Sequence, residues 1–269
     1  MPKYSFDDLV YLMSRLRDPQ DGCPWDLEQD FASIVPFTIE ETYELVDAIE
    51  TSDNQQIKDE LGDVLFQVIF YSQLANEQSM FSIDDVLDNL IDKLIRRHPH
   101  VFPEGDLQSR KGRQNIAKEQ VKVSWEAIKA NERGGKAQFG LLDDIPDALP
   151  ALTRSSKLQK RAATVGFDWD NLSDVINKVK EELSELESAK ASGDVSEIEH
   201  ELGDLLFSCV NLSRHLKLTP ETALRKANQR FERRFAYIEK ALSEKGGSAQ
   251  QASADEMEAL WVEAKQQGL

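Results

Sequence analysis

Pairs of acidic residues three positions apart are the feature of this sequence that points most directly to chemistry. Two such pairs stand close together in the second half of the chain, and they consist of Glu182, Glu185, Glu201 and Asp204. Residues at positions i and i+3 share one face of a helix. Carboxylates that converge repel one another, and a hard divalent cation such as Mg²⁺, with Mn²⁺ as the alternative, removes that cost. These four acids, the C-terminal acidic quartet, are therefore predicted metal ligands.

The spacing of the pairs predicts how they meet. Gly193 is midway between Glu185 and Glu201, and it is also midway between Glu182 and Asp204. An antiparallel hairpin that turns at Gly193 places all four carboxylates at one level. In a chain with 49 acidic residues, single pairs of this spacing arise by chance on solvated helix faces. The fact that both acidic pairs are centred on the same residue, Gly193, is what favours a metal site over chance.

The chain contains this arrangement twice. Residues 57–66 read IKDELGDVLF and residues 198–207 read IEHELGDLLF, so seven of ten positions are identical. A second set of acids, centred on Ser52, forms the N-terminal acidic quartet of Glu41, Glu44, Glu60 and Asp63. An internal repeat of this kind predicts two tandem copies of one module.

Basic and aromatic residues follow the acids of the second copy. Lys226 and Arg230 are four positions apart, as are Trp261 and Lys265, and Lys178 precedes the first acidic pair by one helical turn. Each cation alone is compatible with a solvated helix face. Beside a metal ion, such side chains are suited to bind phosphate oxygens. Trp261 is equally compatible with stacking on a base and with filling the core.

Helical periodicity covers most of each copy. In the second copy an apolar stripe runs through Leu172, Val175, Ile176, Val179, Leu183 and Leu186. Asn171 or Ser173 is a candidate N-cap, the Ser-Gly-Asp segment at 192–194 ends this helix, and another helix is predicted over 195–216. The Thr-Pro pair at 219–220 is typical of a further helix start. Because β-branched alternation is nearly absent, we predict an all-α fold of helical hairpins.

Length and composition limit the classes of protein. For 269 residues we expect modules at 1–130 and 146–269, joined by a Gly-containing polar linker at 131–145. The net charge of −17 argues against binding to a nucleic-acid polymer, though not against a small phosphorylated ligand held through a metal. The absence of a long apolar run and of a signal-peptide pattern predicts no membrane partner. Cys23 and Cys209 are far apart and are expected to be reduced in the cytoplasm.

Longer motifs accompany the acidic pairs. The second copy contains EE-x-x-E, E-x-x-D and then K-x-N-x-R-F, and the last of these includes Lys226, Asn228 and Arg230. Other segments of the same kind are CPWD (23–26), EETYEL (40–45), ELGDVLFQ (60–67), RRHPHVF (96–102), ELGDLLF (201–207) and KANQRFERRF (226–235). Over nearly its whole length the chain resembles the two-copy members of the MazG family of nucleoside triphosphate pyrophosphohydrolases.

The resemblance implies an all-α, Mg²⁺-dependent hydrolase that acts as a homodimer and converts nucleoside triphosphates to monophosphates and pyrophosphate. It implies that the C-terminal acidic quartet binds the metal and that the nucleotide is contacted by Lys178, Lys226, Asn228, Arg230, Trp261 and Lys265. A metal-activated water would attack the α-phosphorus, and Lys226 and Arg230 would stabilise the leaving pyrophosphate. Glu181 or Glu182 would be the general base, and the sequence does not choose between them.

The two copies differ in their basic residues. Asn89 stands at the position that corresponds to Lys226, and Phe37 stands at the position that corresponds to Lys178. We therefore expect the second copy to be the main catalyst. The first copy is expected to hold a weak or inactive site, with a dimerising or regulatory role, and dimerisation is expected to complete the helical bundles.

The sequence supports other functions less well. A di-iron carboxylate bundle needs two Glu-x-x-His motifs, and the sequence holds a single one at Glu197 and His200. A metal-free helical adaptor or dimerisation protein is the remaining alternative. It predicts that added metal does not change the thermal stability of the protein.

Overall fold

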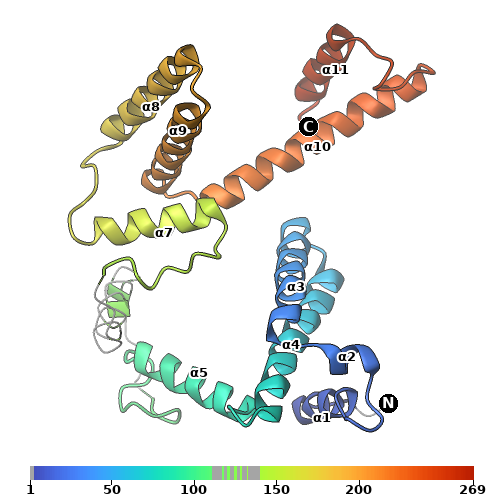
Figure 1. The fold of residues 1–269 in the computed structure, drawn as a ribbon, viewed down its shortest axis with the longest axis vertical. Coiled ribbons are helices and arrows are strands. Elements are labelled where there is room, and N and C mark those ends of the chain that lie inside the picture. The colour runs from blue at the N-terminus through green and yellow to red at the C-terminus, as the bar shows by residue number, and fades with distance from the viewer. Residues whose placement is uncertain are drawn as a thin grey trace. The chain divides into compact units, whose positions relative to one another are not determined.

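The computed structural model describes residues 3–110 and 140–269, together with residues 117, 120, 121, 124, 125, 128 and 132. These residues form helices, turns and loops without any strand (Figure 1), which confirms the predicted all-α fold. The chain divides into two compact units, Met1–Asn131 and Glu132–Leu269. Most of the linker predicted at 131–145 lies outside the described residues. None of the helices described is long and apolar enough to cross a membrane.

The first unit is organised around a long helical hairpin. Its helices are α1 (Phe6–Leu16), α2 (Pro24–Glu28), α3 (Phe31–Thr51), α4 (Asn54–Glu77) and α5 (Ile83–Arg97). The hairpin consists of α3 and α4, and both α1 and α5 pack against α4. The buried core of this unit contains Met13, Ile34, Ile69, Phe70 and Leu74.

The second unit repeats the hairpin and adds a helical arm. Its helices are α7 (Ala151–Ala163), α8 (Leu172–Ser192), α9 (Val195–His215), α10 (Pro220–Glu244) and α11 (Ala254–Gln266). The hairpin consists of α8 and α9, and α7 packs against α9. Figure 1 shows α10 leaving the end of α9 and α11 packed along the far half of α10. We call α10 and α11 the C-terminal arm, and its core contains Ile238, Leu242 and Leu260.

The same turn chemistry builds both hairpins. Ser52 and Gly193 end the first helix of each hairpin in the left-handed conformation, with φ of 60° and 76°. Asp53 and Asp194 then cap the second helix by accepting hydrogen bonds from its first backbone N–H groups. The predicted turn centres are confirmed. At the start of α8 the cap is Asn171, which accepts a hydrogen bond from the backbone N–H of residue 174.

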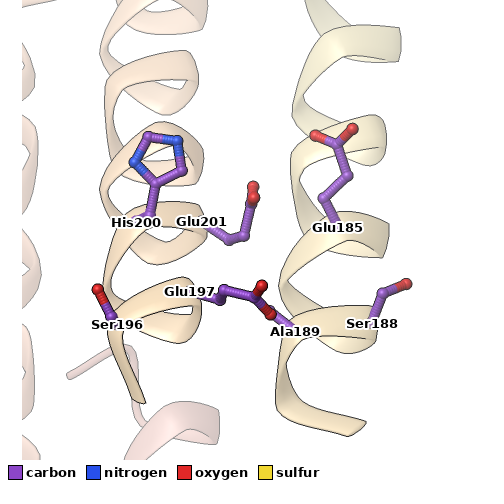
Figure 2. Close-up of a pocket in the computed structure, with 7 residues that line it drawn as sticks. All are labelled: Glu185, Ser188, Ala189, Ser196, Glu197, His200 and Glu201. Atoms are coloured by element: carbon purple, nitrogen blue, oxygen red, sulfur yellow. The ribbon is translucent and has the colours of Figure 1, made fainter. Parts of the chain in front are cut away.

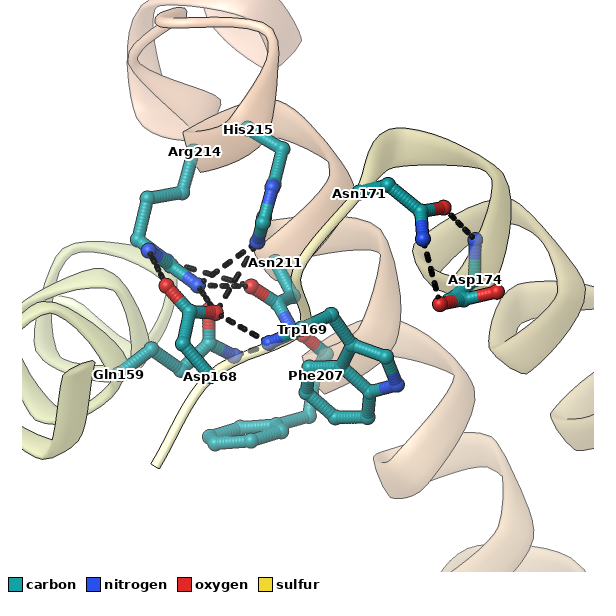
Figure 3. Close-up of polar contacts among 9 residues, drawn as sticks. All are labelled: Gln159, Asp168, Trp169, Asn171, Asp174, Phe207, Asn211, Arg214 and His215. Atoms are coloured by element: carbon teal, nitrogen blue, oxygen red, sulfur yellow. Dashed lines mark hydrogen bonds and ion pairs between the residues drawn. The ribbon is translucent and has the colours of Figure 1, made fainter. Parts of the chain in front are cut away.

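The loop that leads into α8 is fixed to the end of α9 by a polar cluster (Figure 3). The carboxylate of Asp168 accepts a hydrogen bond from Arg214 Nη1 at 2.8 Å, and His215 Nε2 lies 3.0 Å from it. Asn211 accepts a second hydrogen bond from Arg214 at 2.7 Å. The Arg214 guanidinium lowers the pKa of Asp168 to about 2. This cluster holds α9 and the start of α8 together and thereby supports the register of the hairpin.

We expect Asp168→Asn to lower the free energy of unfolding by about 1–2 kcal/mol, because the neutral amide forms weaker hydrogen bonds with Arg214. The pKa of Asp168 in the folded protein is lower than the ordinary 3.8. The contribution of its ion pair to stability is therefore complete above pH 3.8, and it is lost as the pH falls to about 2. Denaturant titrations at pH 7 and pH 2.5 measure the difference. Asp170→Asn is the matched control. A stability difference that is equal at both pH values would contradict the ionic role of Asp168.

Candidate active site

Three of the four predicted ligands in the second unit converge. Glu182 on α8 and both Glu201 and Asp204 on α9 each offer one oxygen, and these three oxygens all lie within 4.8 Å of one another. Glu182 is 5% exposed, and the other two residues are half-buried. The turn at Gly193 brings the two acidic faces to the same level. A set of carboxylate oxygens this close is suited to a hard divalent cation.

The fourth predicted ligand, Glu185, stands beside this cluster and not within it. It lines an adjoining pocket of about 670 Å³ between α8 and α9. Figure 2 shows Glu185 on one helix across the pocket from Glu197 and Glu201 on the other. Desolvation of the carboxylate and the neighbouring Glu182 charge raise the pKa of Glu185, although the residue as a whole is exposed. The pocket continues from the three-carboxylate cluster toward the turn, and its other lining residues are Ser188, Ala189, Ser196 and His200.

Of the basic residues predicted to contact the nucleotide, Lys178 is the one that the structure brings to the cluster. Its ammonium group lies 2.9 Å from Glu182 Oε1, and it donates a hydrogen bond to Glu181 at 2.7 Å. These two contacts raise the pKa of Lys178 above its ordinary value. Glu181 itself is exposed. The cluster therefore has a carboxylate at its edge, Glu181, that is held by Lys178 and lies outside the three converging oxygens.

The first unit holds the same arrangement of acids as the second unit, but the residue at the position of Lys178 is uncharged. Glu41, Glu60 and Asp63 offer oxygens within 4.8 Å of one another, while Glu44 lies outside this set of three and interacts with Glu60. Burial and the neighbouring carboxylates raise the pKa of Glu41 and of Glu60. At the position of Lys178 the first unit has Phe37, whose ring packs edge-on against Trp25 with centroids 5.6 Å apart. An aromatic contact therefore replaces the ammonium group of the second unit.

The other predicted nucleotide contacts lie on the C-terminal arm. Lys226 and Arg230 are exposed on α10, and Lys265 is exposed on α11. Trp261 is half-buried, with its ring centroid 5.4 Å from that of Phe231 and 5.7 Å from Lys265 Nζ. Part of the Trp261 ring therefore fills the core of the arm. Asn228 is exposed two positions after Lys226, on a different face of α10.

Arg234 is a candidate that the sequence analysis missed. Its guanidinium lies 5.3 Å from the Trp261 ring centroid, and it donates a hydrogen bond to the carbonyl of Leu269 at 2.7 Å. Arg234 continues the four-residue spacing of Lys226 and Arg230. This spacing is the feature of the sequence that could have identified it. We use the term cationic face for the surface of the arm formed by Lys226, Arg230, Arg234, Trp261 and Lys265.

Within the second unit, as far as the structure describes it, the acidic cluster and the cationic face are not brought together. In the described part of the second unit, α8 packs extensively only against α9. The arm contacts the rest of the unit through α10, which meets α7 and α9, while α11 packs on α10 (Figure 1). The predicted residues therefore fall into two separate groups: carboxylates with one lysine on the hairpin, and cations with a tryptophan on the arm.

Comparison with known proteins agrees with this repeated architecture. The family profile for the MazG nucleotide pyrophosphohydrolase domain matches residues 29–102 and 171–237, which include both hairpins. The nucleoside triphosphate pyrophosphohydrolase of Escherichia coli K12 is 48% identical over 263 residues, covering 97% of both chains. The nucleoside triphosphate pyrophosphohydrolase/pyrophosphatase MazG of Thermotoga maritima is 43% identical over 97% of this chain and 95% of its own.

Proposed function

The chain belongs to the MazG family of nucleotide pyrophosphohydrolases, and from this premise we propose that its second unit hydrolyses nucleoside triphosphates to nucleoside monophosphates and pyrophosphate. The observation that carries the proposal is the convergence of Glu182, Glu201 and Asp204 beside Lys178 and an open pocket. A triphosphate bound there would have its phosphates at the carboxylate cluster and its nucleoside in the pocket.

The donor set fits Mg²⁺, with Mn²⁺ as the alternative, since all the converging atoms are carboxylate oxygens. The residues that would hold the ion are Glu182, Glu201 and Asp204, with Glu185 at the margin of the cluster. When bound, the ion would neutralise phosphate charge and lower the pKa of a water molecule. Lys178 would then orient phosphate oxygens from the opposite edge of the cluster.

Glu181 is our candidate for the general base. It lies outside the three converging oxygens, so it keeps lone pairs that can accept a proton from water, and Lys178 fixes its position at 2.7 Å. Proton transfer from water to Glu181 would accompany attack on the α-phosphorus. The cationic face would stabilise the negative charge that develops on the pyrophosphate.

Glu181→Gln is expected to lower kcat by about 10²–10⁴-fold, because the amide cannot accept the proton. The Mg²⁺-dependent rise in thermal stability should remain, because the three converging oxygens are intact. Steady-state kinetics and thermal-shift titrations with Mg²⁺ separate the two effects. If activity is unchanged, or if the metal response is lost together with activity, Glu181 is not the base.

The activity itself is tested by identifying the products. We expect mixed ribo- and deoxyribonucleoside triphosphates to yield monophosphates and pyrophosphate in the presence of Mg²⁺, and no turnover with excess EDTA. Anion-exchange separation of the nucleotides, with a separate assay for pyrophosphate, is the measurement. Diphosphates and phosphate would contradict attack at the α-phosphorus. No turnover and no thermal response to any divalent cation would favour a metal-free adaptor.

The first unit would hold at most a weak site. Its acids have the geometry of the second unit, but Phe37 occupies the position of Lys178. The exposed apolar residues of its hairpin include Leu61, Leu65 and Val68. Because apolar surface of this kind favours association, we propose that the chain forms a homodimer and that the first unit contributes to dimerisation or regulation.

A further inference from the structure

We propose that the ion pair of Asp168 with Arg214 sets the affinity of the second unit for its divalent cation, by holding α8 and α9 at the spacing that the metal ligands need. The inference rests on the metal site of the proposed function and adds two positioning residues to it. Both residues lie outside the acidic cluster. We call the polar cluster of Asp168, Asn211, Arg214 and His215 the hairpin clamp (Figure 3).

The first argument is the place of the clamp along the hairpin. The turn is centred on Gly193, and the same midpoint places Leu172, the first residue of α8, level with Arg214 on α9. Glu182 lies ten residues after Leu172 and Asp204 lies ten residues before Arg214, which corresponds to about 15 Å along each helix axis. The carboxylates are therefore about midway between the turn, which joins the helices covalently, and the clamp, which closes their open end.

The second argument is that few buried apolar side chains join these two helices. In α8 and α9, both of which are described in full, the buried apolar residues are Val175, Ala189 and Val210. The hairpin of the first unit is held differently, by a buried apolar cluster that includes Ile34 of α3 and Phe70 of α4. The second hairpin therefore depends more strongly on polar contacts to keep its helices together.

The third argument is that the acids themselves push the helices apart. Glu182, Glu201 and Asp204 bring three carboxylate oxygens within 4.8 Å of one another, and the ammonium group of Lys178 contacts Glu182. Converging negative charges repel one another until a cation binds between them. A hairpin with a free end would relieve this repulsion by separating its helices, and the clamp opposes that movement.

The clamp is suited to this role because its contacts are multiple and partly shielded from water. Asp168 accepts hydrogen bonds from Arg214 through both carboxylate oxygens, and Arg214 also donates a hydrogen bond to the buried Asn211. The side chains of Asp168, Arg214 and His215 are 25%, 19% and 15% exposed. Paired bonds between a guanidinium and a carboxylate fix the geometry as well as the charge.

Preorganisation connects the clamp to metal affinity. A cation binds more tightly to ligands that are already in place, because no free energy is then spent on bringing them together. The loss of stability predicted above for Asp168→Asn corresponds to a factor of about 5–30 in an equilibrium constant. We expect the affinity for a divalent cation to fall by the same factor. The first unit has Pro24 and Gln73 at the positions of Asp168 and Arg214, so this dependence is confined to the second unit.

The test is a titration of the full chain with Mn²⁺, followed by electron paramagnetic resonance of the free ion. The parent chain carries Glu41→Gln, which disables the acidic cluster of the first unit. We expect Asp168→Asn and Arg214→Gln each to raise the Mn²⁺ dissociation constant about 5–30-fold. The double variant should show no further loss, because either substitution already breaks the clamp. Asp168→Glu keeps the charge and should recover most of the affinity. An unchanged dissociation constant in Asp168→Asn, or additive losses in the double variant, would overturn the proposal.

Two matched substitutions separate positioning from general effects. Asp144 forms a similar two-oxygen ion pair with Arg161 of α7, at 2.6 and 3.1 Å, and neither residue belongs to the hairpin. Asp144→Asn should lower stability and leave the Mn²⁺ dissociation constant unchanged. Asp170→Asn removes one negative charge close to Asp168 and should likewise leave it unchanged. A loss of affinity in either control as large as that in Asp168→Asn would overturn the positioning role.

Hydrolysis distinguishes this inference from the proposed function. In Asp168→Asn, the Mg²⁺ concentration that gives half-maximal turnover should rise by the same factor as the Mn²⁺ dissociation constant, while kcat at saturating Mg²⁺ stays within a few-fold of the parent. A lower kcat at saturating Mg²⁺ with unchanged metal affinity would overturn the inference. If the clamp controls Mn²⁺ affinity but the parent hydrolyses no nucleotide, the proposed function fails and the inference stands. Absence of Mn²⁺ binding by the parent would overturn both.

Discussion

Glu182→Gln is expected to lower kcat by about 10³-fold or more, equivalent to about 4 kcal/mol of transition-state stabilisation. Glu182 is the most buried of the three converging acids and is the one that contacts Lys178. The amide retains the shape of the side chain but supplies neither the negative charge for a cation nor the ion pair with Lys178. The Mg²⁺-dependent thermal shift of the second unit should disappear with the activity.

Glu41→Gln in the first unit is the matched substitution. We expect kcat to stay within a few-fold of wild type, since the position of Lys178 is occupied there by Phe37. Burial and the charges of Asp63 and Glu44 raise the pKa of Glu41. Because its negative charge is disfavoured in the absence of a cation, a neutral amide should maintain or increase stability. Loss of turnover in Glu41→Gln with activity preserved in Glu182→Gln would reverse the assignment of the catalytic unit.

Arg230→Ala is expected to lower kcat/KM by about 10²–10³-fold, because a guanidinium that binds the developing pyrophosphate charge is removed. Arg230 is exposed on α10, so its loss should leave the helix folded. The measurement is steady-state hydrolysis of a triphosphate at saturating Mg²⁺, accompanied by circular dichroism.

Lys240→Ala is the control for Arg230→Ala. Lys240 is an exposed cation on the same helix, but it lies ten residues beyond Arg230, about 15 Å farther along the helix axis. We expect its activity to stay close to wild type. Equal losses in the two variants would mean that the general positive charge of α10, and not a specific face, supports the reaction.

Local chemistry explains why so much of the fold could be predicted. The turn at Gly193 follows from a residue that adopts positive φ without strain, followed by Asp194 as the N-cap of the next helix. The i, i+3 spacing then fixes the acidic face of each helix, and the symmetry about the turn fixes their level. The convergence of Glu182, Glu201 and Asp204 was thus contained in the sequence, because each step depends on neighbours within a few residues.

Details of side-chain packing could not be predicted in this way. Glu185 follows Glu182 by three residues and so lies on the same face of α8. Its side chain nevertheless stands in the pocket beside the cluster. Arg234 gains its place through contacts with Trp261 and Leu269, which lie far along the chain. The cluster of Asp168 with Arg214 likewise joins residues 46 positions apart. Such contacts depend on which helix faces meet, and periodicity alone does not specify that.

The sequence by itself determined that this protein is all-helical, that it repeats one hairpin twice, and that each hairpin gathers acids at one level. The motifs also pointed to the family to which the chain belongs. Only the tertiary structure decided that the basic residues are divided, with Lys178 beside the acids and the others on a separate arm. The physical reason is that helical periodicity is a local property. The direction in which α10 leaves the hairpin is set by its packing against α7, α9 and α11.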